Sequence, residues 1–329
     1  MYIMMDYLLI NLSWDHSENG VIMMKMVDVH GLTKIFGNIT AVDDLTFEVE
    51  KGEIFGLLGP NGAGKTTTMR MLCCLLSPTS GSATVGNFDI SDKKGAMDIR
   101  KMIGLVPDNV GLYETLSAYA NLEFFARMYE IPEQLTKENI EKYLKKLDLW
   151  ERRDQIVGSF SKGMKQKVAL ARALIHDPEI LLMDEPTANL DPEAAKNIRD
   201  IILDLKKENK TILLNTHNLD EAQRICDRIG VLKTKLIAMD TPQNLERAVF
   251  GKRTVILLEE VTDKIMGAIR TENPKSIERD GNKLIIEMRD PDKETSAIIS
   301  TIVSAGGKVR SVEETGASLE DVYLKLVRS

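Results

Sequence analysis

Short apolar runs recur along the chain and alternate with helix-forming segments. Ile180–Met183 and Thr211–Leu214 are runs of this kind, and Glu53–Leu58 also has the pattern of a strand. Strands of a parallel sheet are buried on both faces, so they appear in a sequence as continuous apolar runs. Helix-forming residues follow one run at Thr67–Leu72 and precede another at Lys167–Leu174. The pattern predicts an α/β domain built on a parallel sheet.

Two other parts of this region have their own patterns. Met26–Val29 has the pattern of a strand and Leu45–Val49 that of its partner, while residues 117–150 are rich in helix-forming residues. In that stretch four residues recur at the spacing of one helix face: Leu122, Phe125, Met128 and Tyr129. Apolar residues at this spacing predict a buried face. We therefore expect a helical subdomain inserted in the α/β domain.

After Pro242 the chain changes to short strands and helices. The predicted strands are 254–258, 277–278, 283–288 and 308–312, and the predicted helices are 263–271, 295–305 and 318–327. Asp280-Gly281 joins two of the strands and is typical of a hairpin turn. The order of elements predicts a small α+β appendage of the ferredoxin-like type. The chain is thus divided into an N-terminal extension (1–25), an α/β domain (26–250) and the appendage (251–329).

A glycine-rich loop follows the strand-like segment Glu53–Leu58. Its glycines let the backbone curl so that several N–H groups point at one anion, and the following helix presents its positive end to the same anion. Lys65 adds a cation that reaches the β- and γ-phosphates of a nucleotide, and the Thr66 hydroxyl is a ligand for Mg²⁺. The predicted nucleotide-binding residues are Gly59, Pro60, Asn61, Gly62, Ala63, Gly64, Lys65, Thr66 and Thr67.

Two adjacent carboxylates end the apolar run Ile180–Met183. Ligands of α/β sheets bind outside the carboxyl ends of the strands, so we expect Asp184 beside the glycine-rich loop. There it would hold Mg²⁺ directly or through water. Glu185 would orient or deprotonate the attacking water. A solvated turn after a strand is the alternative, which the matching phosphate loop disfavours.

A second helix start precedes this strand. Ser161-Lys162-Gly163 opens the helix-forming run Lys167–Leu174. Locally, Ser161 fits an N-cap, and the stretch would then only initiate a helix. A serine hydroxyl and exposed N–H groups at a helix start also make a phosphate clamp. Since one chain needs only one phosphate loop, a second clamp indicates a site shared between two copies of the chain.

Composition narrows the class of protein. The chain has 329 residues, a net charge of −7 and three cysteines without metal-ligand spacing. The acidic balance does not indicate a nucleic-acid-binding surface, so no nucleic-acid partner is expected. An odd number of cysteines without a secretory signal suits a reducing cytosol. No apolar run approaches the roughly 20 residues of a membrane span.

The first 25 residues precede the patterns described above. They contain several methionines, and their apolar opening is short and broken by Asp6. Such an opening does not have the form of a signal peptide. We expect a start assigned too far upstream, with initiation near Met23, Met24 or Met26; a membrane-touching extension is the alternative.

Five motifs together resemble those of the ATP-binding subunits of ABC transporters. In the family's order, they are Walker A (59–66), the signature loop (160–166), Walker B with its catalytic glutamate (180–185), the D-loop (188–191) and the H-loop (215–217). The resemblance covers roughly residues 27–249. It implies the fold of a P-loop NTPase, the ABC ATPase fold, with a helical subdomain.

The resemblance also implies a head-to-tail homodimer that holds two ATP molecules and Mg²⁺ between its subunits. Each ATP would lie between Walker A of one chain and the Ser161 and Gly163 of the other. His217 would contact the γ-phosphate, and Phe36 would stack on adenine. From local patterns alone, His217 is a surface or core histidine and Phe36 an ordinary apolar residue near a turn.

One position departs from the family's pattern. The loop after Met102–Pro107 normally carries a glutamine that touches Mg²⁺ and couples the nucleotide state to the membrane partner, whereas this chain has Asp108. An aspartate can ligate magnesium directly. It can also simply cap the following loop. Both roles of Asp108 stay open.

The end of the chain, residues 317–326, resembles the tail of ATP-binding subunits in ABC-2 type exporters, a group that includes daunorubicin-resistance and sodium-extrusion systems. The resemblance implies an ATP-hydrolysing subunit, peripheral to the cytoplasmic side of the membrane, that drives a separate integral-membrane permease. The permease would dock in a groove of the helical subdomain lined by residues 108–119. From its local pattern, the tail is an amphipathic helix that packs onto its own domain.

A soluble ABC ATPase that acts on DNA or ribosomes is the alternative function. DNA-repair versions insert a long coiled coil between the phosphate loop and the signature, and this stretch has no heptad run. Ribosome-acting versions usually carry two ATPase units, and this chain has one set of motifs. Both comparisons favour the transporter subunit.

Overall fold

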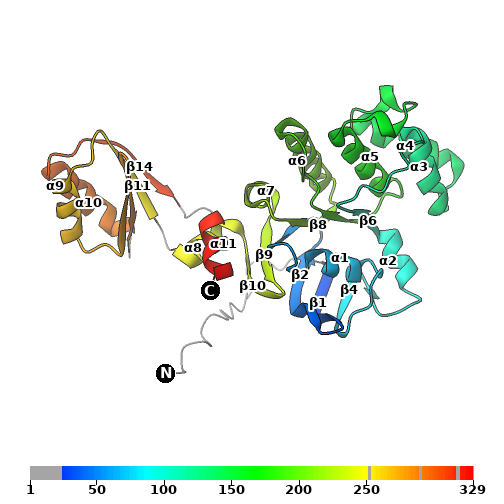
Figure 1. The fold of residues 1–329 in the computed structure, drawn as a ribbon, viewed down its shortest axis with the longest axis horizontal. Coiled ribbons are helices and arrows are strands. Elements are labelled where there is room, and N and C mark those ends of the chain that lie inside the picture. The colour runs from blue at the N-terminus through cyan, green and yellow to red at the C-terminus, as the bar shows by residue number, and fades with distance from the viewer. Residues whose placement is uncertain (1–23, 251–252, 289–290, 316–318, 329) are drawn as a thin grey trace.

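Three β-sheets organise the chain in the computed structural model, which describes residues 24–250, 253–288, 291–315 and 319–328 (Figure 1). Of the predicted extension 1–25, residues 1–23 lie outside this description. The elements up to the appendage are β1 (Lys25–Phe36), β2 (Ile39–Glu50), β3 (Ile54–Leu58), α1 (Lys65–Leu72), β4 (Ser80–Val85), β5 (Phe88–Asp89), α2 (Ala96–Met102), β6 (Ile103–Val106), α3 (Ala118–Met128), α4 (Glu133–Lys146), α5 (Lys162–Leu174), β7 (Ile180–Asp184), α6 (Pro192–Lys207), β8 (Thr211–Thr216), α7 (Leu219–Ile225), β9 (Arg228–Lys233), β10 (Lys235–Asp240) and α8 (Pro242–Phe250). Two 3₁₀ turns lie between α4 and α5, at Trp150–Arg152 and Val157–Ser159. The remaining elements are β11 (Arg253–Leu258), α9 (Asp263–Thr271), β12 (Ser276–Asp280), β13 (Lys283–Glu287), α10 (Pro291–Ser304), β14 (Val309–Thr315) and α11 (Leu319–Arg328).

The central sheet has the strand order β10-β9-β3-β8-β7-β6. Its strands from β9 to β6 pair in parallel, and β10 adds an antiparallel edge. Every residue of β3, β7 and β8 is buried, as continuous apolar runs predict. Because these strands are parallel neighbours, their carboxyl ends meet at one edge of the sheet. The predicted α/β fold is confirmed.

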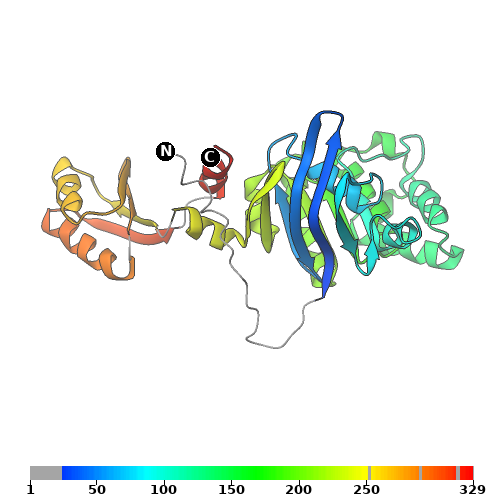
Figure 2. The same ribbon diagram turned by 90° about the horizontal axis from the view of Figure 1, so that it is seen from below.

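Two apolar cores cover the faces of the central sheet. On one face the antiparallel sheet β2-β1-β4-β5 and α1 form a core with residues of β3, β7 and β8. The rings of Phe47 on β2 and Phe55 on β3 stack there with centroids 5.1 Å apart. The other core includes residues of α3 to α7. The central sheet is therefore the middle layer, as Figure 2 shows from below.

The helices α3 and α4 form the helical subdomain predicted at residues 117–150, and α5 packs against both. Leu122 on α3 is fully buried, and Phe125 and Tyr129 pack against the same core. The prediction for Met128 is wrong, because its side chain is 69% exposed. Met128 is the last residue of α3 and lines a surface groove instead of the core.

The four strands of the appendage have the spatial order β12-β13-β11-β14, and all three pairings are antiparallel. With α9 and α10 in their places along the chain, this is the β-α-β-β-α-β order of the ferredoxin-like fold. Ile256, Ile269 and Ile302 belong to a separate core that these elements share. The appendage thus has its own apolar interior.

The last helix does not pack onto the appendage with which the prediction grouped it. Leu319 and Val322 of α11 are fully buried in the large core of the α/β domain, where α11 contacts α8 and α7. The Lys233 ammonium at the end of β9 also donates to the carbonyl oxygen of Val327, at 2.7 Å. Figures 1 and 2 show α8 and α11 together, between the central sheet and the appendage. An amphipathic pattern predicts a buried face but does not say which element covers it.

Truncation of one side chain of α11 tests whether this helix packs on the large core. Val322→Ala removes two buried methyl groups and should lower the free energy of unfolding of the intact chain by about 2 kcal/mol. Val303→Ala on α10 is the matched control, because Val303 is 56% exposed and should change stability little. Denaturant unfolding followed by circular dichroism measures both. Equal stabilities for the two variants would contradict the packing of α11 on the large core.

One buried carboxylate lies at the amino end of β3, away from the edge where the strands end. Glu53 is 7% exposed, accepts a hydrogen bond from the N–H of Glu50 at 2.7 Å and forms an ion pair with Arg228 at 3.4 Å. Burial raises the pKa of Glu53 from 4.5 to about 7, against the opposing effects of these two partners. The carboxyl group of Glu53 therefore stays protonated to a higher pH in the folded chain than in the unfolded chain.

This difference predicts a pH dependence of stability with a definite sign. Between pH 4.5 and 7 the folded state binds more protons at Glu53 than the unfolded state, so the stability contributed by this proton falls as the pH rises, by about 3 kcal/mol in total. Glu53→Gln removes the titration. The variant should therefore gain stability relative to the unmodified chain on going from pH 5 to pH 8. Denaturant unfolding at both pH values measures the gain, and a difference that stays constant with pH would refute the raised pKa.

Candidate functional site

The glycine-rich loop joins β3 to α1 and has no room for side chains at two of its glycines. A Cβ atom at Gly59 would lie 2.3 Å from the carbonyl oxygen of Leu232, and one at Gly64 would lie 2.4 Å from that of Ala41. Gly64 also has a φ of 100°, a conformation that favours glycine. It is the N-cap of α1 and offers no side chain to the first N–H groups of the helix. Those N–H groups are therefore available to an anion.

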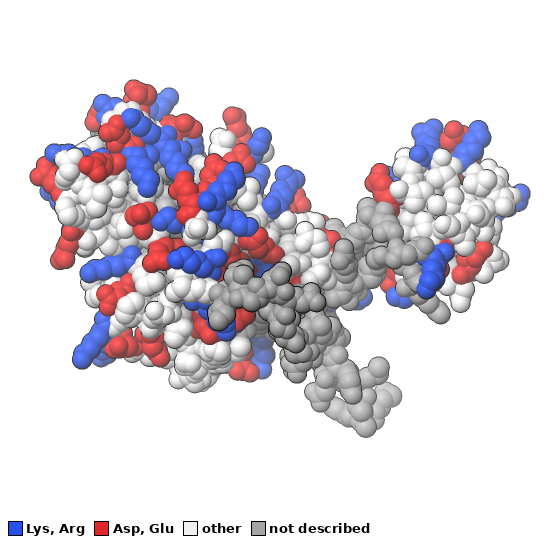
Figure 3. All heavy atoms as spheres, turned by 180° about the vertical axis from the view of Figure 1, so that it is seen from behind, with Lys and Arg blue, Asp and Glu red and all other residues white. Residues whose placement is uncertain are grey.

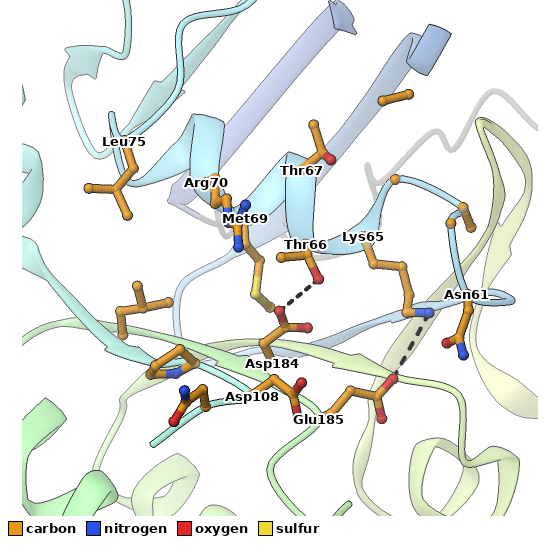
Figure 4. A pocket seen from close by; sticks show the side chains of 17 residues that line it. Asn61, Lys65, Thr66, Thr67, Met69, Arg70, Leu75, Asp108, Asp184 and Glu185 are labelled. Carbon is orange, nitrogen blue, oxygen red and sulfur yellow. Dashed lines mark hydrogen bonds and ion pairs between the residues drawn. The ribbon is translucent and has the colours of Figure 1, made fainter. Parts of the chain in front are cut away.

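Lys65 is a buried cation at the start of α1. Its ammonium donates to the carbonyl oxygens of Gly59 at 2.6 Å and Pro60 at 3.2 Å, and it lies 4.0 Å from Oε1 of Glu185 (Figure 4). Burial lowers the pKa of Lys65, although the carboxylates of Glu185 and Asp184 oppose the shift. A buried ammonium held mainly by neutral carbonyls is stabilised by an anion that enters the pocket.

Asp184 ends β7 and has a hydrogen-bond donor on each oxygen. The Thr66 hydroxyl donates to Oδ2 at 2.7 Å, and the Asn215 amide donates to Oδ1 at 3.1 Å. Asn215 lies directly opposite Asp184 in the parallel pairing of β7 with β8. These contacts fix the orientation of the carboxylate toward the start of α1.

Glu185 follows Asp184 in an unusual backbone conformation. Its φ is 51°, which is uncommon for residues other than glycine, and its N–H donates to the carbonyl oxygen of Asn215 at 2.9 Å. Its Oε2 lies 2.8 Å from Nδ1 of His217. Strained conformations of this kind concentrate at functional sites, where surrounding contacts maintain them. The end of β8 thus fixes the backbone of Glu185, and His217 fixes the orientation of its side chain.

The loop after β6 brings Asp108 to the same pocket. Asp108 lines it together with Asp184 and Glu185, and Figure 4 shows Asp184 bonded to Thr66 with Asp108 and Glu185 nearby. Arg172 of α5 holds this loop, because its guanidinium donates to the carbonyl oxygens of Val110 at 2.6 Å and Gly111 at 2.9 Å.

The resulting pocket has a volume of about 640 Å³, within the range usual for ligand sites. It brings together the following predicted residues: Asn61, Gly62, Ala63, Gly64, Lys65, Thr66, Thr67, Asp108, Asp184 and Glu185. Six other predicted residues do not line it: Phe36, Gly59, Pro60, Ser161, Gly163 and His217. Of these, His217 reaches the pocket through its contact with Glu185. Phe36 ends β1 with 47% of its surface exposed.

The signature residues form a separate helix start at α5. Ser161 is the N-cap, its hydroxyl accepts the N–H of Met164 at 3.3 Å, and its side chain is exposed. A Cβ atom on Gly163 would lie 2.9 Å from that of Ala194 on α6. The start of α5 is therefore packed against the helix that follows the D-loop, and it does not contribute to the pocket of its own chain.

A second groove, of about 400 Å³, lies between α2 and α3. The lining residues include the apolar Met97, Phe125 and Met128 and the basic Arg100 and Lys101. None of the residues 108–119, which were expected to form a docking groove, lines it.

Sequence reasoning missed three polar residues around the carboxylates: Asn215, Thr187 and Glu221. Asn215 contacts Asp184, and Glu221 accepts hydrogen bonds from the hydroxyls of Thr187 and Thr216. For Asn215 the signal was its place at the end of an apolar strand. The contacts of Glu221 had no signal, because they join residues from different elements.

Known proteins resemble this chain in sequence and in fold. The family model described as "ABC transporter" matches residues 42–188. The linearmycin resistance ATP-binding protein LnrL of Bacillus subtilis is 31% identical over 92% of this chain and 98% of its own length. This chain belongs to the family of ABC transporter ATP-binding proteins. A Nod factor export ATP-binding protein I of Cupriavidus metallidurans is 35% identical over 92% of the chain and 98% of its own length.

A solved structure supports the same family. A dimeric ATP-binding cassette in a post-hydrolysis state, bound to ADP and Pi, is 28% identical, with a TM-score of 0.60 over 66% of this chain and 98% of that one. This ABC transporter ATP-binding protein is accordingly an ATPase. Among the helices that the structure describes, none has both the length and the apolar character needed to cross a membrane.

The contacts of Lys65 predict the effect of its removal. Lys65→Ala eliminates the buried cation that faces the pocket, so we expect ATP affinity to fall at least about 100-fold, which corresponds to about 3 kcal/mol. Lys51→Ala, at an exposed lysine before β3, is the control and should bind ATP normally. Equilibrium titration with a fluorescent ATP analogue measures both variants. Undiminished affinity of Lys65→Ala would contradict the placement of the phosphates.

Proposed function

We propose that this ATPase is the energy-coupling subunit of an ABC exporter, acting as a homodimer on a separate integral-membrane permease. The observation that carries the proposal is the separation of the two halves of the site. Lys65, Thr66, Asp184 and Glu185 meet in one pocket, whereas Ser161 begins a helix elsewhere on the surface. A second copy of the chain supplies the missing half.

The pocket residues fit ATP and Mg²⁺. The first turn of α1 and the buried Lys65 receive the phosphates. No group of three or more His, Cys, Asp or Glu side chains suited to a metal ion occurs in the described part of the chain. Mg²⁺ is commonly held by one or two carboxylates together with phosphate oxygens. Thr66, Asp184 and Asp108 would hold the ion here, and it would neutralise charge on the phosphates.

Hydrolysis uses Glu185 as the general base. Its Oε2 is bonded to Nδ1 of His217, so Oε1 is the oxygen that takes the proton of the attacking water. As the water oxygen bonds to the γ-phosphorus, the bond to the bridging oxygen of ADP breaks, and Lys65 stabilises the charge on the phosphates. His217 is 60% exposed and can face the γ-phosphate at the dimer interface.

The dimer forms around the nucleotide. The exposed N-terminus of α5, with the Ser161 hydroxyl, would bind the γ-phosphate of the ATP held by the partner. Phe36 would stack on adenine. Cleavage and release of the γ-phosphate remove the anion that joins the two surfaces, and the subunits separate.

The permease would dock in the groove between α2 and α3. Its apolar lining suits an amphipathic helix, and Arg100 and Lys101 provide charges to orient it. Export rather than import is supported by the printed names of the Nod factor export and linearmycin resistance relatives, whose likeness extends over 92% of the chain. The protein would then lie on the cytoplasmic face of the membrane.

Action on DNA or ribosomes has less support. The relatives that match most of the chain are named for export or resistance. Acidic and basic side chains are interspersed over the face shown in Figure 3, a distribution unlike the basic stripe of a nucleic-acid-binding surface.

Substitution of the general base tests the proposal. Glu185→Gln keeps the size of the side chain but cannot accept the proton, so kcat should fall at least about 100-fold while ATP binding remains. The variant should then form a stable dimer in the presence of ATP. Glu179→Gln is the control, since Glu179 precedes the same strand and is exposed. Size-exclusion chromatography with and without ATP gives the answer, and a monomer that hydrolyses ATP at the normal rate would overturn the proposal.

A further inference from the structure

A buried carboxylate outside the nucleotide pocket joins the two segments that carry Glu185 and His217. Glu221 lies on α7 and is 1% exposed. Its Oε1 accepts the hydroxyl of Thr187 at 2.7 Å, and its Oε2 accepts the hydroxyl of Thr216 at 2.8 Å. Thr187 and Thr216 are themselves buried, with 8% and 1% of their surfaces exposed. The carboxylate thus bridges the turn after β7 and the end of β8.

The local sequence predicts a different role for this glutamate. Asn218 is the N-cap of α7 and Glu221 stands three positions later, which is the pattern of a capping box. One half of the box is present, since Asn218 Oδ1 accepts the N–H of Glu221 at 3.1 Å. In the other half, the N–H of Asn218 donates to the Thr216 hydroxyl oxygen at 3.0 Å instead of to Glu221. The Glu221 carboxylate is therefore committed to the two threonines.

The positions of these threonines relate the bridge to the reaction. Thr187 lies two residues after Glu185, and Thr216 immediately precedes His217. The 2.8 Å contact between Glu185 and His217 spans the same two segments. We propose that Glu221 is a positioning residue for ATP hydrolysis, which ties Thr187 to Thr216 and so fixes the geometry between Glu185 and His217. The proposal rests on the roles of Glu185 and His217 given above.

Two physical arguments support this assignment. Burial of a carboxylate without hydrogen bonds is strongly unfavourable, so Glu221 holds both threonines firmly in place. Glu185 has a positive φ, and contacts on both sides of such a residue are needed to maintain its conformation. Its own N–H bonds to β8 on one side, and Thr187 is the anchor on the other. Misplacement of a reacting group by about 1 Å can lower a rate about 100-fold.

Isosteric removal of one hydroxyl is the main test, with a matched control on the same strand. Thr216→Val removes the donor to Glu221 and the acceptor of the Asn218 N–H, whereas Thr211→Val removes a hydroxyl that accepts the N–H of Gly52 at the opposite end of β8. Both side chains are 1% exposed. We expect kcat of Thr216→Val to fall about tenfold with KM for ATP changed less than about twofold. Thr211→Val should have the normal kcat at temperatures at which it is folded.

A conservative variant distinguishes the hydrogen bonds of Glu221 to the two threonines from the packing of its side chain. Gln at position 221 can bond one threonine through its oxygen and the other through its amide N–H groups. Glu221→Gln should therefore retain most of kcat, while Glu221→Ala should lose it about tenfold or more at unchanged KM. If Glu221→Ala does not fold, Thr187→Val replaces it, with Thr187→Ser as the rescuing variant.

The outcomes are distinguishable. A normal kcat for Thr216→Val and Thr187→Val would overturn the positioning role, as would equal losses of kcat in Thr216→Val and Thr211→Val. Neither result concerns the general base, which Glu185→Gln tests separately. If Glu185→Gln kept its turnover, the proposed mechanism would fail first, whatever the Glu221 variants show.

Discussion

The parallel pairing of β8 with its two neighbours is the constraint on which the site depends. On one side Asn215 lies opposite Asp184 of β7, and on the other Thr216 lies opposite Leu58 of β3. The phosphate loop, the two carboxylates and His217 therefore emerge at one edge from three adjacent strands. A shift of the register by one residue would turn Asn215 to the opposite face of the sheet and leave Asp184 without its amide donor.

The end of β8 then organises the carboxylates through consecutive residues. Asn215 bonds the side chain of Asp184 and the N–H of Glu185, Thr216 bonds Glu221, and His217 bonds Glu185. Asp184, Asn215, Thr216 and Glu221 are buried, and networks of buried polar groups are stable only when nearly all members are satisfied. The Oδ1 atom of Asn215 is one buried atom in the described residues without a partner.

The sequence predicted those features that short segments determine by themselves. The buried strands, the phosphate loop and the β-α-β-β-α-β order of the appendage follow from apolar runs, glycine spacing and a hairpin turn. Predictions failed where the partner of a pattern mattered. Met128 keeps the helical spacing but lies beyond the covered part of α3, and α11 packs onto the large core. No role was predicted for Glu221, because the threonines that its carboxylate bonds come from two other segments of the chain.

The packing of α11 connects the appendage to the helix that carries Glu221. The chain leaves the ATPase domain after α8, forms the appendage, and returns as α11 to contact α8 and α7. Because α7 begins directly after Asn218 and carries Glu221, α11 supports the helix that holds the end of β8 in place. The apolar contacts of Leu319 and Val322 therefore contribute to the same structure as the polar contacts of Glu221. Helices covered on one side only open more readily than those packed on both, so removal of α11 would loosen α7 before it affected the strands of the central sheet.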